Sequence, residues 1–295
     1  MREKLVHWRL VVLFLLAFGV MVVGYLLWGE DRRGILTVAF LDVGQGDAIL
    51  IDSPTGNQVL VDGGPAAGGA VLRALGAALP FYDRSLDLVI ATHPDADHIG
   101  GLPVVLERYQ VRGFMEPGIV SETQTSQALA QALAAKKITT ILARRGQVID
   151  LGRGAKLQIL FPDEESERRA EQKNDTNAAS IVAVLRYGAT SAMLTGDAPI
   201  AVEDYLINLD RNNRAELDAD ILKAGHHGSR TSTSDEWLSA TTPSVAIISA
   251  GKNNRYGHPH QETLARLTAH QIKTLATAGE GTIVFKTDGV TWWRD

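Results

Sequence analysis

Cysteine is absent from this sequence of 295 residues. Its absence excludes disulfides, thiolate metal sites and cysteine nucleophiles. Any transition-metal site in the chain must therefore be built from histidine and carboxylate side chains. The lack of cysteine is compatible with either side of a bacterial membrane, so it does not indicate a compartment.

An excess of positive charge is also lacking. The formal net charge is -5, so the molecule as a whole does not attract nucleic acid electrostatically. Bound metal ions can nevertheless supply positive charge locally. Short basic pairs are more often solvated faces than DNA clamps, and this holds for Arg144-Arg145, Arg168-Arg169, and Arg211 with Arg214.

The sequence begins with a long apolar run over residues 8–28. It contains one charge, Arg9, followed by about twenty apolar residues, enough to cross a hydrocarbon core of roughly 30 Å. Trp8, Tyr25 and Trp28 lie near its ends, where amphipathic rings prefer the membrane interface. The run is apolar on every face, unlike a buried core helix, and it lacks the small-x-small cleavage pattern of a signal peptide. We therefore interpret it as an uncleaved membrane anchor.

Basic residues on either side of the run suggest its orientation. Three precede or begin it and two follow it, namely Arg2, Lys4, Arg9, Arg32 and Arg33. The positive-inside rule then favours a cytoplasmic N-terminus and an extracytoplasmic soluble domain. We divide the chain into residues 1–33, with the cytoplasmic tip, anchor and hinge, and residues 34–295, which form one catalytic domain.

The soluble part contains both strand-like and helical patterns. Residues 35–64 hold three β-branched apolar runs separated by turn residues, which predict antiparallel strands. From residue 87 onward, apolar strand-like runs alternate with helical patterns such as 102–109 and 259–270. Two sheets with helices outside would bury such strands on both faces. We predict one α/β domain, built as an α+β sandwich.

The sharpest motif is HPDADH at residues 93–98, directly after a predicted strand. The carboxyl end of a strand is the usual place for an α/β active site. Alternate side chains of an extended turn share a face, so His93, Asp95 and Asp97 can converge, with His98 following at the start of a helix. A polar turn with a capping aspartate explains one of these residues but not the whole cluster.

Further polar motifs follow in a fixed order. They are LDVGQGDA at 41–48, VLVDGG at 59–64, LTGD at 194–197, LKAGHHGS at 222–229 and NRYGHP at 254–259. Together with HPDADH they resemble the metallo-β-lactamase superfamily, and in combination the hydrolase domain of ComEC/Rec2 competence proteins. The resemblance covers nearly all of residues 35–295. It implies an αββα metallo-β-lactamase-like fold, here preceded by one transmembrane helix.

The resemblance also implies metal ligands. His93 and Asp95 would bind a first divalent ion, Asp97 and His98 a second, and Asp197 would bridge them. His226 or His227 would complete the second site. Two adjacent histidines cannot both point into one strand face, so we favour His227.

Other residues would support the site or contact substrate. By resemblance, Asp62 orients the metal loop, and we expect Asp42 and Asp47 to act in the same supporting way. The glycines between Asp42 and Asp47 either form a simple turn or allow a close approach of the backbone to the metal loop. The candidate substrate contacts are Asn177, Ser180, Ser229 and His258. Ser229 also fits a simple turn cap.

The first metal site departs from the common pattern. Where many relatives have a third histidine, this chain has Asn177-Ala-Ala-Ser180. The site is then poorer in imidazole and richer in oxygen, which favours Mn²⁺ or Mg²⁺ over Zn²⁺. We expect two divalent ions, Mn²⁺ or Zn²⁺.

The implied chemistry is hydrolysis of a phosphodiester. Two cations about 3.5–4 Å apart lower the pKa of a water between them. Asp97 and Asp197 would orient that water, and His258 would bind the phosphate or protonate the leaving oxygen.

The expected function is a membrane-anchored nuclease acting on DNA. Because we find one span in this sequence, DNA transport would need a separate channel or competence subunit as partner. Two alternatives remain open. One is hydrolysis of another phosphodiester, such as a cell-wall phosphorylcholine ester or a cyclic nucleotide. The other is a catalytically inactive scaffold or binding subunit of a DNA-uptake system.

Overall fold

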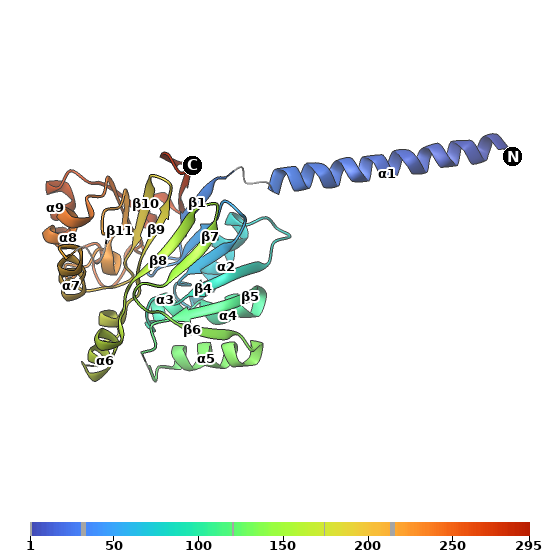
Figure 1. Ribbon diagram of the computed structural model, residues 1–295. Coiled ribbons are helices and arrows are strands. Elements are labelled where there is room, and N and C mark those ends of the chain that lie inside the picture. Colours follow the sequence, from blue (N-terminus) through green and yellow to red (C-terminus); the bar gives the residue numbers. More distant parts are fainter. Residues whose placement is uncertain (1, 31–33, 120, 174, 213–215) are drawn as a thin grey trace.

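The computed structural model describes residues 2–30, 34–119, 121–173, 175–212 and 216–295 (Figure 1). Helix α1 (Arg2–Glu30) extends away from a domain of two β-sheets and surrounding helices. Arg214, from one of the basic pairs, lies outside the described residues.

Helix α1 carries the long apolar run. Its described side chains, from His7 to Gly24, are exposed, and this window has a mean hydropathy of 2.0. A helix of this length and composition near an N-terminus fits both a membrane span and a signal sequence. The remaining residues used to predict topology lie outside those whose side chains are described: Arg2, Lys4, Tyr25, Trp28, Arg32 and Arg33.

The first sheet has eight strands in the order β15-β14-β1-β2-β3-β4-β5-β6. Their bounds are β1 Leu36–Phe40, β2 Ile49–Asp52, β3 Gln58–Val61, β4 Ser85–Ile90, β5 Gln110–Glu116, β6 Thr139–Leu142, β14 Ile283–Thr287 and β15 Trp292–Arg294. Strands β1 to β3 are antiparallel, as the short turns between them predict, whereas β3 to β6 run parallel. The carboxyl ends of β3, β4 and β5 therefore meet at one edge.

The second sheet has seven strands in the order β13-β12-β11-β10-β9-β8-β7. Their bounds are β7 Val148–Gly152, β8 Ala155–Phe161, β9 Val182–Tyr187, β10 Thr190–Leu194, β11 Ile221–Lys223, β12 Val245–Ile248 and β13 Lys273–Ala276. Strands β10 to β13 are parallel. This sheet therefore also has an edge where several carboxyl ends meet.

Helices cover the outer faces of the two sheets. The longer ones after α1 are α2 Ala70–Ala78, α4 Leu102–Arg108, α5 Gln124–Lys136, α6 Glu164–Lys173, α7 Ile200–Asp210, α8 Asp235–Thr241 and α9 Gln261–Ala269. The short ones are η1 Ala67–Gly69, α3 Ala96–Ile99, η2 Asn177–Ala179, η3 Gly225–Gly228 and α10 Thr277–Glu280.

Three buried apolar clusters define the layers. The first lies between the sheets and joins residues such as Phe40 and Ile159. The second joins the outer face of the first sheet to α2, α4 and α5, and the third joins the second sheet to α7, α8 and α9. The chain is thus layered helix, sheet, sheet, helix, and the predicted αββα fold is confirmed. All three clusters fall within residues 36–285, so the domain has a complete core without α1.

A substitution of Trp237 on α8 tests the packing of the third apolar cluster. The side chain is 1% exposed and packs in the third cluster. We expect Trp237→Ala to lower the free energy of unfolding by about 3–5 kcal/mol, because it leaves a large cavity. Trp293 in β15 is 40% exposed, so Trp293→Ala, the matched control, should cost less than about 1 kcal/mol. Urea unfolding followed by circular dichroism measures both, and equal losses would contradict this assignment of the core.

Candidate metal centre

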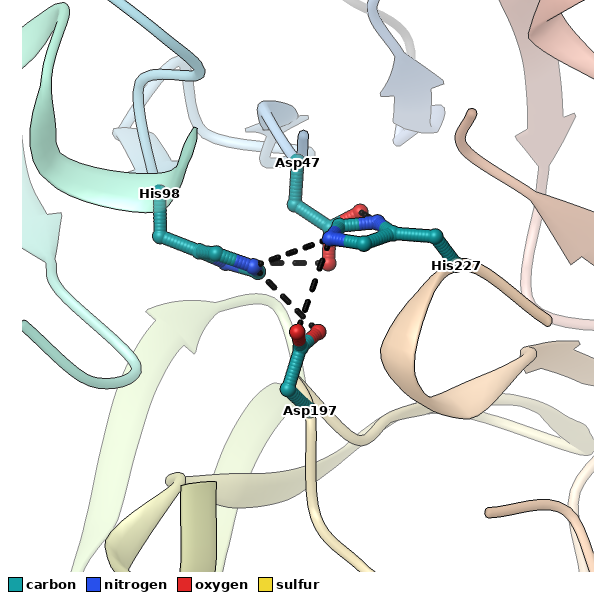
Figure 2. Close-up of side chains that lie close together, drawn as sticks. All are labelled: Asp47, His98, Asp197 and His227. Atoms are coloured by element: carbon teal, nitrogen blue, oxygen red, sulfur yellow. Dashed lines mark hydrogen bonds and ion pairs between the residues drawn. The ribbon is translucent and has the colours of Figure 1, made fainter. Parts of the chain in front are cut away.

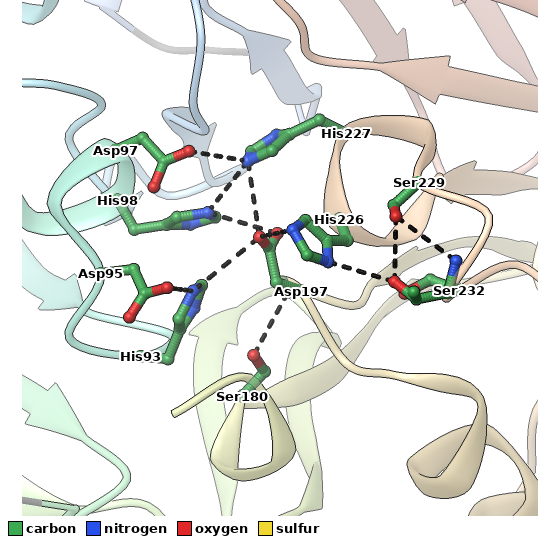
Figure 3. A network of polar contacts seen from close by, with 12 residues as sticks. His93, Asp95, Asp97, His98, Ser180, Asp197, His226, His227, Ser229 and Ser232 are labelled. Carbon is green, nitrogen blue, oxygen red and sulfur yellow. Dashed lines mark hydrogen bonds and ion pairs between the residues drawn. The ribbon is translucent and has the colours of Figure 1, made fainter. Parts of the chain in front are cut away.

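The carboxyl ends of parallel strands from both sheets bring the polar motifs together. Asp62 follows β3 and the HPDADH loop follows β4, so they lie at one edge of the first sheet. Asp197 follows β10, and His226 and His227 follow β11 at the corresponding edge of the second sheet. Figure 3 shows side chains from the two edges pointing at one another. The site is therefore assembled between the sheets, where ligands of α/β proteins usually bind.

Four imidazoles surround one carboxylate, that of Asp197 (Figure 3). His98 Nε2 lies 3.2 Å from Asp197 Oδ1. The Nε2 atoms of His226 and His227 each lie 3.5 Å from Oδ2, and that of His93 lies 3.9 Å from it. The same nitrogen of every ring thus faces one buried acidic group.

The Nδ1 atoms of the two loop histidines point away from Asp197 and are fixed by hydrogen bonds. His98 Nδ1 lies 2.7 Å from Asp62 Oδ2, and His93 Nδ1 lies 3.0 Å from the Thr92 hydroxyl. Thr92 itself donates to Asp62 through both its backbone N–H and its hydroxyl, at 2.7 Å each. Such partners fix the orientation of a ligating histidine and direct its other nitrogen at the metal.

The pair His226 and His227 departs from the expectation that only one ring faces the site. Both residues have positive φ, 49° and 56°, so the chain turns sharply in η3 and both rings reach Asp197. His227 Nδ1 lies 2.9 Å from the Ser249 carbonyl. A carbonyl only accepts, so His227 donates from Nδ1, which leaves Nε2 as the coordinating nitrogen.

The two loop aspartates lie at the more open side of the cluster. Asp97 Oδ2 is 3.3 Å from His227 Nε2, and Asp95 Oδ2 is 3.7 Å from His93 Nε2. Thr176 donates to the other oxygen of Asp95 at 2.7 Å. Their side chains are 28% and 40% exposed, so both carboxylates remain accessible to a ligand from solvent.

Asp47 reaches further into the site than its expected supporting role. Ligand atoms of Asp47, His98, Asp197 and His227 lie within 4.8 Å of one another (Figure 2). The glycine-rich turn makes this possible, because a Cβ on Gly46 would lie 2.0 Å from the Asp97 carbonyl oxygen. The close approach to the metal loop is thus present, and the Asp47 backbone N–H donates to the same carbonyl at 3.3 Å.

Lys223 is a buried site residue that the sequence reasoning missed. Its Nζ lies 2.5 Å from Asp47 Oδ2 and 3.7 Å from Asp197 Oδ1, and it donates to the Gly196 carbonyl at 3.1 Å. The side chain is fully buried, which is rare for lysine unless it is paired. The available signal was a single charge at the end of an otherwise apolar strand.

These contacts shift the pKa values in opposite directions. Burial favours the neutral form of Asp47 and Asp197, yet Lys223 and His227 hold the pKa of both carboxyls well below the usual value. Burial likewise lowers the pKa of His227, but Asp197 and Asp47 outweigh it and raise the pKa to about 9. Burial and the neighbouring His98 lower the pKa of His93 to about 3. Without metal, the site thus holds ionised acids, a protonated His227 and a neutral His93.

The donor set fits a divalent cation. His98 Nε2 and His227 Nε2 lie 3.3 Å apart. Since the Nδ1 atoms of both rings already have acceptors, the two Nε2 atoms face each other and are placed to bind one cation in place of their protons. Asp47 Oδ1, Asp197 Oδ1 and His93 Nε2 are also buried without a hydrogen-bond partner among the described residues. Imidazole and carboxylate together suit Zn²⁺ or Mn²⁺.

The expected substrate contacts occupy different positions. Ser180 is fully buried, and its hydroxyl accepts from the Asp197 backbone N–H at 3.2 Å, so it supports the metal loop. Ser229 is buried and accepts from the backbone N–H of Thr231, as a turn cap does. Asn177 is half-buried in η2, with its Oδ1 lacking a hydrogen-bond partner among the described residues.

His258 lies beside the histidine cluster. Its ring centroid is 5.4 Å from that of His226, and it stacks on Tyr256 at 5.7 Å. Burial and the charge of His226 lower its pKa to about 4, so it is neutral at neutral pH. The adjacent His260 instead precedes α9, where its Nδ1 accepts from the backbone N–H of Arg230.

Asp42 lies apart from the cluster, which corrects its expected place among the supporting residues. Its side chain is exposed, and its carboxylate accepts from the Gly44 backbone N–H at 3.1 Å. Its own N–H donates to the Thr282 hydroxyl. It therefore shapes the glycine-rich turn, and among the described residues no contact between its side chain and the histidines is shown.

The fold and these motifs identify the chain as a member of the metallo-β-lactamase superfamily, which it matches over residues 41–252. It is 34% identical over 265 residues to ComE operon protein 3 of Bacillus subtilis, covering 84% of this chain and 33% of that protein. It is 30% identical over 277 residues to Recombination protein 2 of Haemophilus influenzae, covering 90% and 31%. The chain thus spans about a third of the length of these curated relatives.

Solved structures show the same fold. YhfI from Bacillus subtilis, a metallo-beta-lactamase fold protein, has a TM-score of 0.53 at 15% identity, with 85% of this chain and 99% of that chain covered. Igni18 from Ignicoccus hospitalis, a metallo hydrolase, has a TM-score of 0.51 at 15% identity, covering 85% and 98%. The chain is therefore a metallo-β-lactamase-fold protein with a hydrolase-type metal site, related to the competence proteins.

The Lys223–Asp47 pair gives a test of the site's charge balance. We expect Lys223→Met to lower the free energy of unfolding of the metal-free protein by about 3–5 kcal/mol, because it leaves a buried carboxylate unpaired. Adding Asp47→Asn should restore part of the loss. Lys286 pairs with Asp295 at the surface, so Lys286→Met, the control, should change stability by at most about 1 kcal/mol. If urea unfolding shows no difference between the two lysine variants, Lys223 does not hold the site together.

Proposed function

We propose that this protein is a membrane-anchored, metal-dependent phosphodiesterase that cleaves DNA. The observation that carries the proposal is the ring of four Nε2 atoms around Asp197, with Asp95 and Asp97 at its open side. The names of its relatives, a ComE operon protein, a recombination protein and a competence protein, favour DNA as the substrate.

Two ligand groups would share Asp197. His93 and Asp95 would hold one divalent ion, and Asp97, His98 and His227 the other. His226 reaches the same carboxylate and adds a further nitrogen. When bound, such ions polarise a phosphoryl oxygen and make water more acidic. Asn177, whose Oδ1 has no hydrogen-bond partner among the described residues, would supply oxygen where many relatives have imidazole, so we favour Mn²⁺, with Zn²⁺ as the alternative.

The chain's own residues would orient the reactants. Asp97 and Asp197 would position the attacking water as hydrogen-bond acceptors. His258 is neutral at neutral pH because its pKa is about 4, so we assign it an N–H hydrogen bond to a phosphoryl or leaving oxygen rather than a positive charge. Asn177 lies near the first ligand group and is our candidate for a direct substrate contact, with Ser180 and Ser229 holding the loops around it.

Binding of DNA would rest on the metal centre more than on a basic face. Several basic residues of the predicted pairs already contact acids: Arg144 with Glu167, Arg145 with Asp163, and Arg169 with Glu165. This agrees with the net charge of -5. The metal ions would then supply much of the attraction for phosphate.

Helix α1 would anchor the domain in the membrane with the catalytic domain outside the cytoplasm. The domain would act on DNA at that surface, beside a separate channel or competence subunit. The exposed apolar window from His7 to Gly24 supports the anchor, and the names of the competence relatives support the partner.

We first predict the effect of removing the metal-site carboxylates. The fragment from Gly34 onward, stripped of metal and resupplied with Mn²⁺ or Zn²⁺, should cleave labelled single- or double-stranded DNA. Asp97→Ala and Asp197→Ala should each lower the rate by at least about a hundredfold, since each removes a ligand and a water-orienting acceptor. Asp42→Ala is the control, and it should retain activity because its side chain is exposed and its carboxylate accepts from the Gly44 backbone N–H.

The substrates of that assay separate the alternatives. Hydrolysis of a bis-phosphate ester chromogen without DNA cleavage would move the substrate to a smaller diester, such as a cell-wall phosphorylcholine ester or a cyclic nucleotide. Inactivity on every substrate, with metal shown to be bound, would favour an inactive scaffold. Full activity in Asp97→Ala would contradict its assigned role.

The identity of the metal is tested at Asn177. Asn177→His would restore an imidazole near the first ligand group, so we expect the ratio of Zn²⁺-supported to Mn²⁺-supported activity to rise. Metal content after dialysis against equal concentrations of both ions provides an independent measurement. Asn212→His, at an exposed position after α7, is the control, and an unchanged metal preference at Asn177→His would count against this account of the site.

A further inference from the structure

A cavity of about 470 Å³ lies directly beside the metal centre. It opens where β4 and β5 end, and helix α5 forms its opposite wall. His93 and Pro94 of the metal loop belong to its lining, so the cavity and the ligand cluster share a wall. Its size is within the usual range of small-molecule sites.

The cavity walls are mainly apolar. Leu129 and Leu133 of α5 and Ile99 of α3 are buried along them. The polar side chains along them are a few hydroxyls, the His93 imidazole of the metal loop and one acid, Glu116. The described lining residues include no phenylalanine, tyrosine or tryptophan and no lysine or arginine. The cavity therefore suits a flat, largely apolar group that carries hydrogen-bond donors.

Glu116 is the polar group that the architecture places there. It is the last residue of β5, where its backbone carbonyl accepts from Ala143 and the preceding Met115 points into the core between the sheets. Burial raises the pKa of its carboxyl. The nearby Arg144 guanidinium donates to the Pro117 and Ala143 carbonyls and pairs with Glu167. Within the described part of the chain, no ion pair or side-chain hydrogen bond is shown for Glu116, which leaves its oxygens as acceptors.

A phosphodiester held at the metal centre extends on both sides of the scissile phosphate. His93 lines both sites, so the group attached on one side of that phosphate can enter the cavity. A carboxylate is an acceptor with two oxygens and can take two parallel N–H donors from one ligand. A nucleobase supplies a flat apolar body for the α5 wall and N–H donors on its Watson–Crick edge.

We propose that this cavity binds the nucleobase next to the scissile phosphate, with Glu116 accepting from its Watson–Crick edge and guanine preferred. The inference rests on the proposed phosphodiesterase function. Guanine presents two adjacent donors, the ring N1–H and the N2 amino group, which match the two carboxylate oxygens. Cytosine and adenine each present one amino group there. Thymine has a single N–H between two carbonyls that repel a carboxylate. A quaternary ammonium group fits less well, because tryptophan, tyrosine and phenylalanine rings are lacking among the described lining residues.

Nucleotide binding tests this without requiring turnover. The metal-free full chain in detergent is titrated with GMP, CMP, AMP and TMP by calorimetry. We expect GMP to bind tightest, and Glu116→Gln to weaken GMP by about tenfold, as the loss of a bidentate base contact does, while TMP changes little. Glu107→Gln, an exposed glutamate on α4 outside this cavity, is the matched control and should leave all four affinities unchanged.

A second variant, at a different residue, makes the test independent of whether Glu116→Gln folds. Ala130 is exposed on α5 and lines the cavity, so Ala130→Phe should fill the space while leaving the core intact. It should weaken the binding of all four nucleotides, and that of GMP most. Equal affinities for the four nucleotides, or GMP binding unaffected by both Glu116→Gln and Ala130→Phe, would overturn the inference.

Cleavage mapping separates this inference from the proposed function. With metal restored, oligothymidines containing one guanine should be cut next to the guanine by the wild-type protein and more evenly by Glu116→Gln. DNA cleavage with no base preference in either protein would leave the nuclease function standing and refute the base site. Glu116-dependent GMP binding without cleavage of any DNA would support the base site and count against the nuclease.

Discussion

Five aspartates gather between the ends of the two sheets, three of them buried, and the burial of this negative charge is the constraint on which the site depends. An ionised carboxylate moved into a protein interior is strongly unfavourable unless it is paired and hydrogen-bonded. Here each acid has a partner of a different kind. Asp62 accepts from Thr92 and His98, Asp47 contacts Lys223, and Asp197 is surrounded by imidazoles. These pairings hold the two edges together, and bound cations would complete the charge balance.

The same constraint explains why the ligands come from parallel strands. Asp62 and the HPDADH loop follow neighbouring strands of one sheet, and Asp197 and the paired histidines follow neighbouring strands of the other. Because neighbouring parallel strands end at the same edge, residues more than a hundred positions apart meet without any long loop. The apolar cluster between the sheets then fixes the distance across which the two edges face one another.

The geometry of this edge also connects metal chemistry to substrate choice. The loop after β4 supplies ligands, and the next strand, β5, ends in Glu116 beside them. Under the proposed function, a change at the end of β5 would alter which group lies next to the scissile bond while the ligands stay in place. Relatives that share a metal site can differ in substrate by this route, since the fold itself does not determine the substrate.

Much of the fold and the ligand cluster could be predicted from sequence, because both depend on local patterns. Apolar runs at strand and helix spacing indicated two sheets with helices outside, and the resemblance implied the αββα fold. HPDADH placed four polar side chains within six residues after a strand. The apolar runs did not indicate five strands, because neither alternation nor a long continuous apolar run stands out in them: β5, β6, β7, β13 and β15. Element boundaries set by such weak patterns depend on pairing with neighbouring strands.

Only the tertiary structure decided the residues whose environment is built from distant parts of the chain. A lysine at the end of an apolar strand becomes a site residue because Asp47 and Asp197 lie against it. His226 and His227 both reach the carboxylate because the backbone adopts two consecutive left-handed conformations. Asp42 stays outside because it lies at the exposed start of the same turn that carries Asp47 inward. Sequence spacing reports which side chains share a local element, whereas contact between elements depends on how the sheets pack.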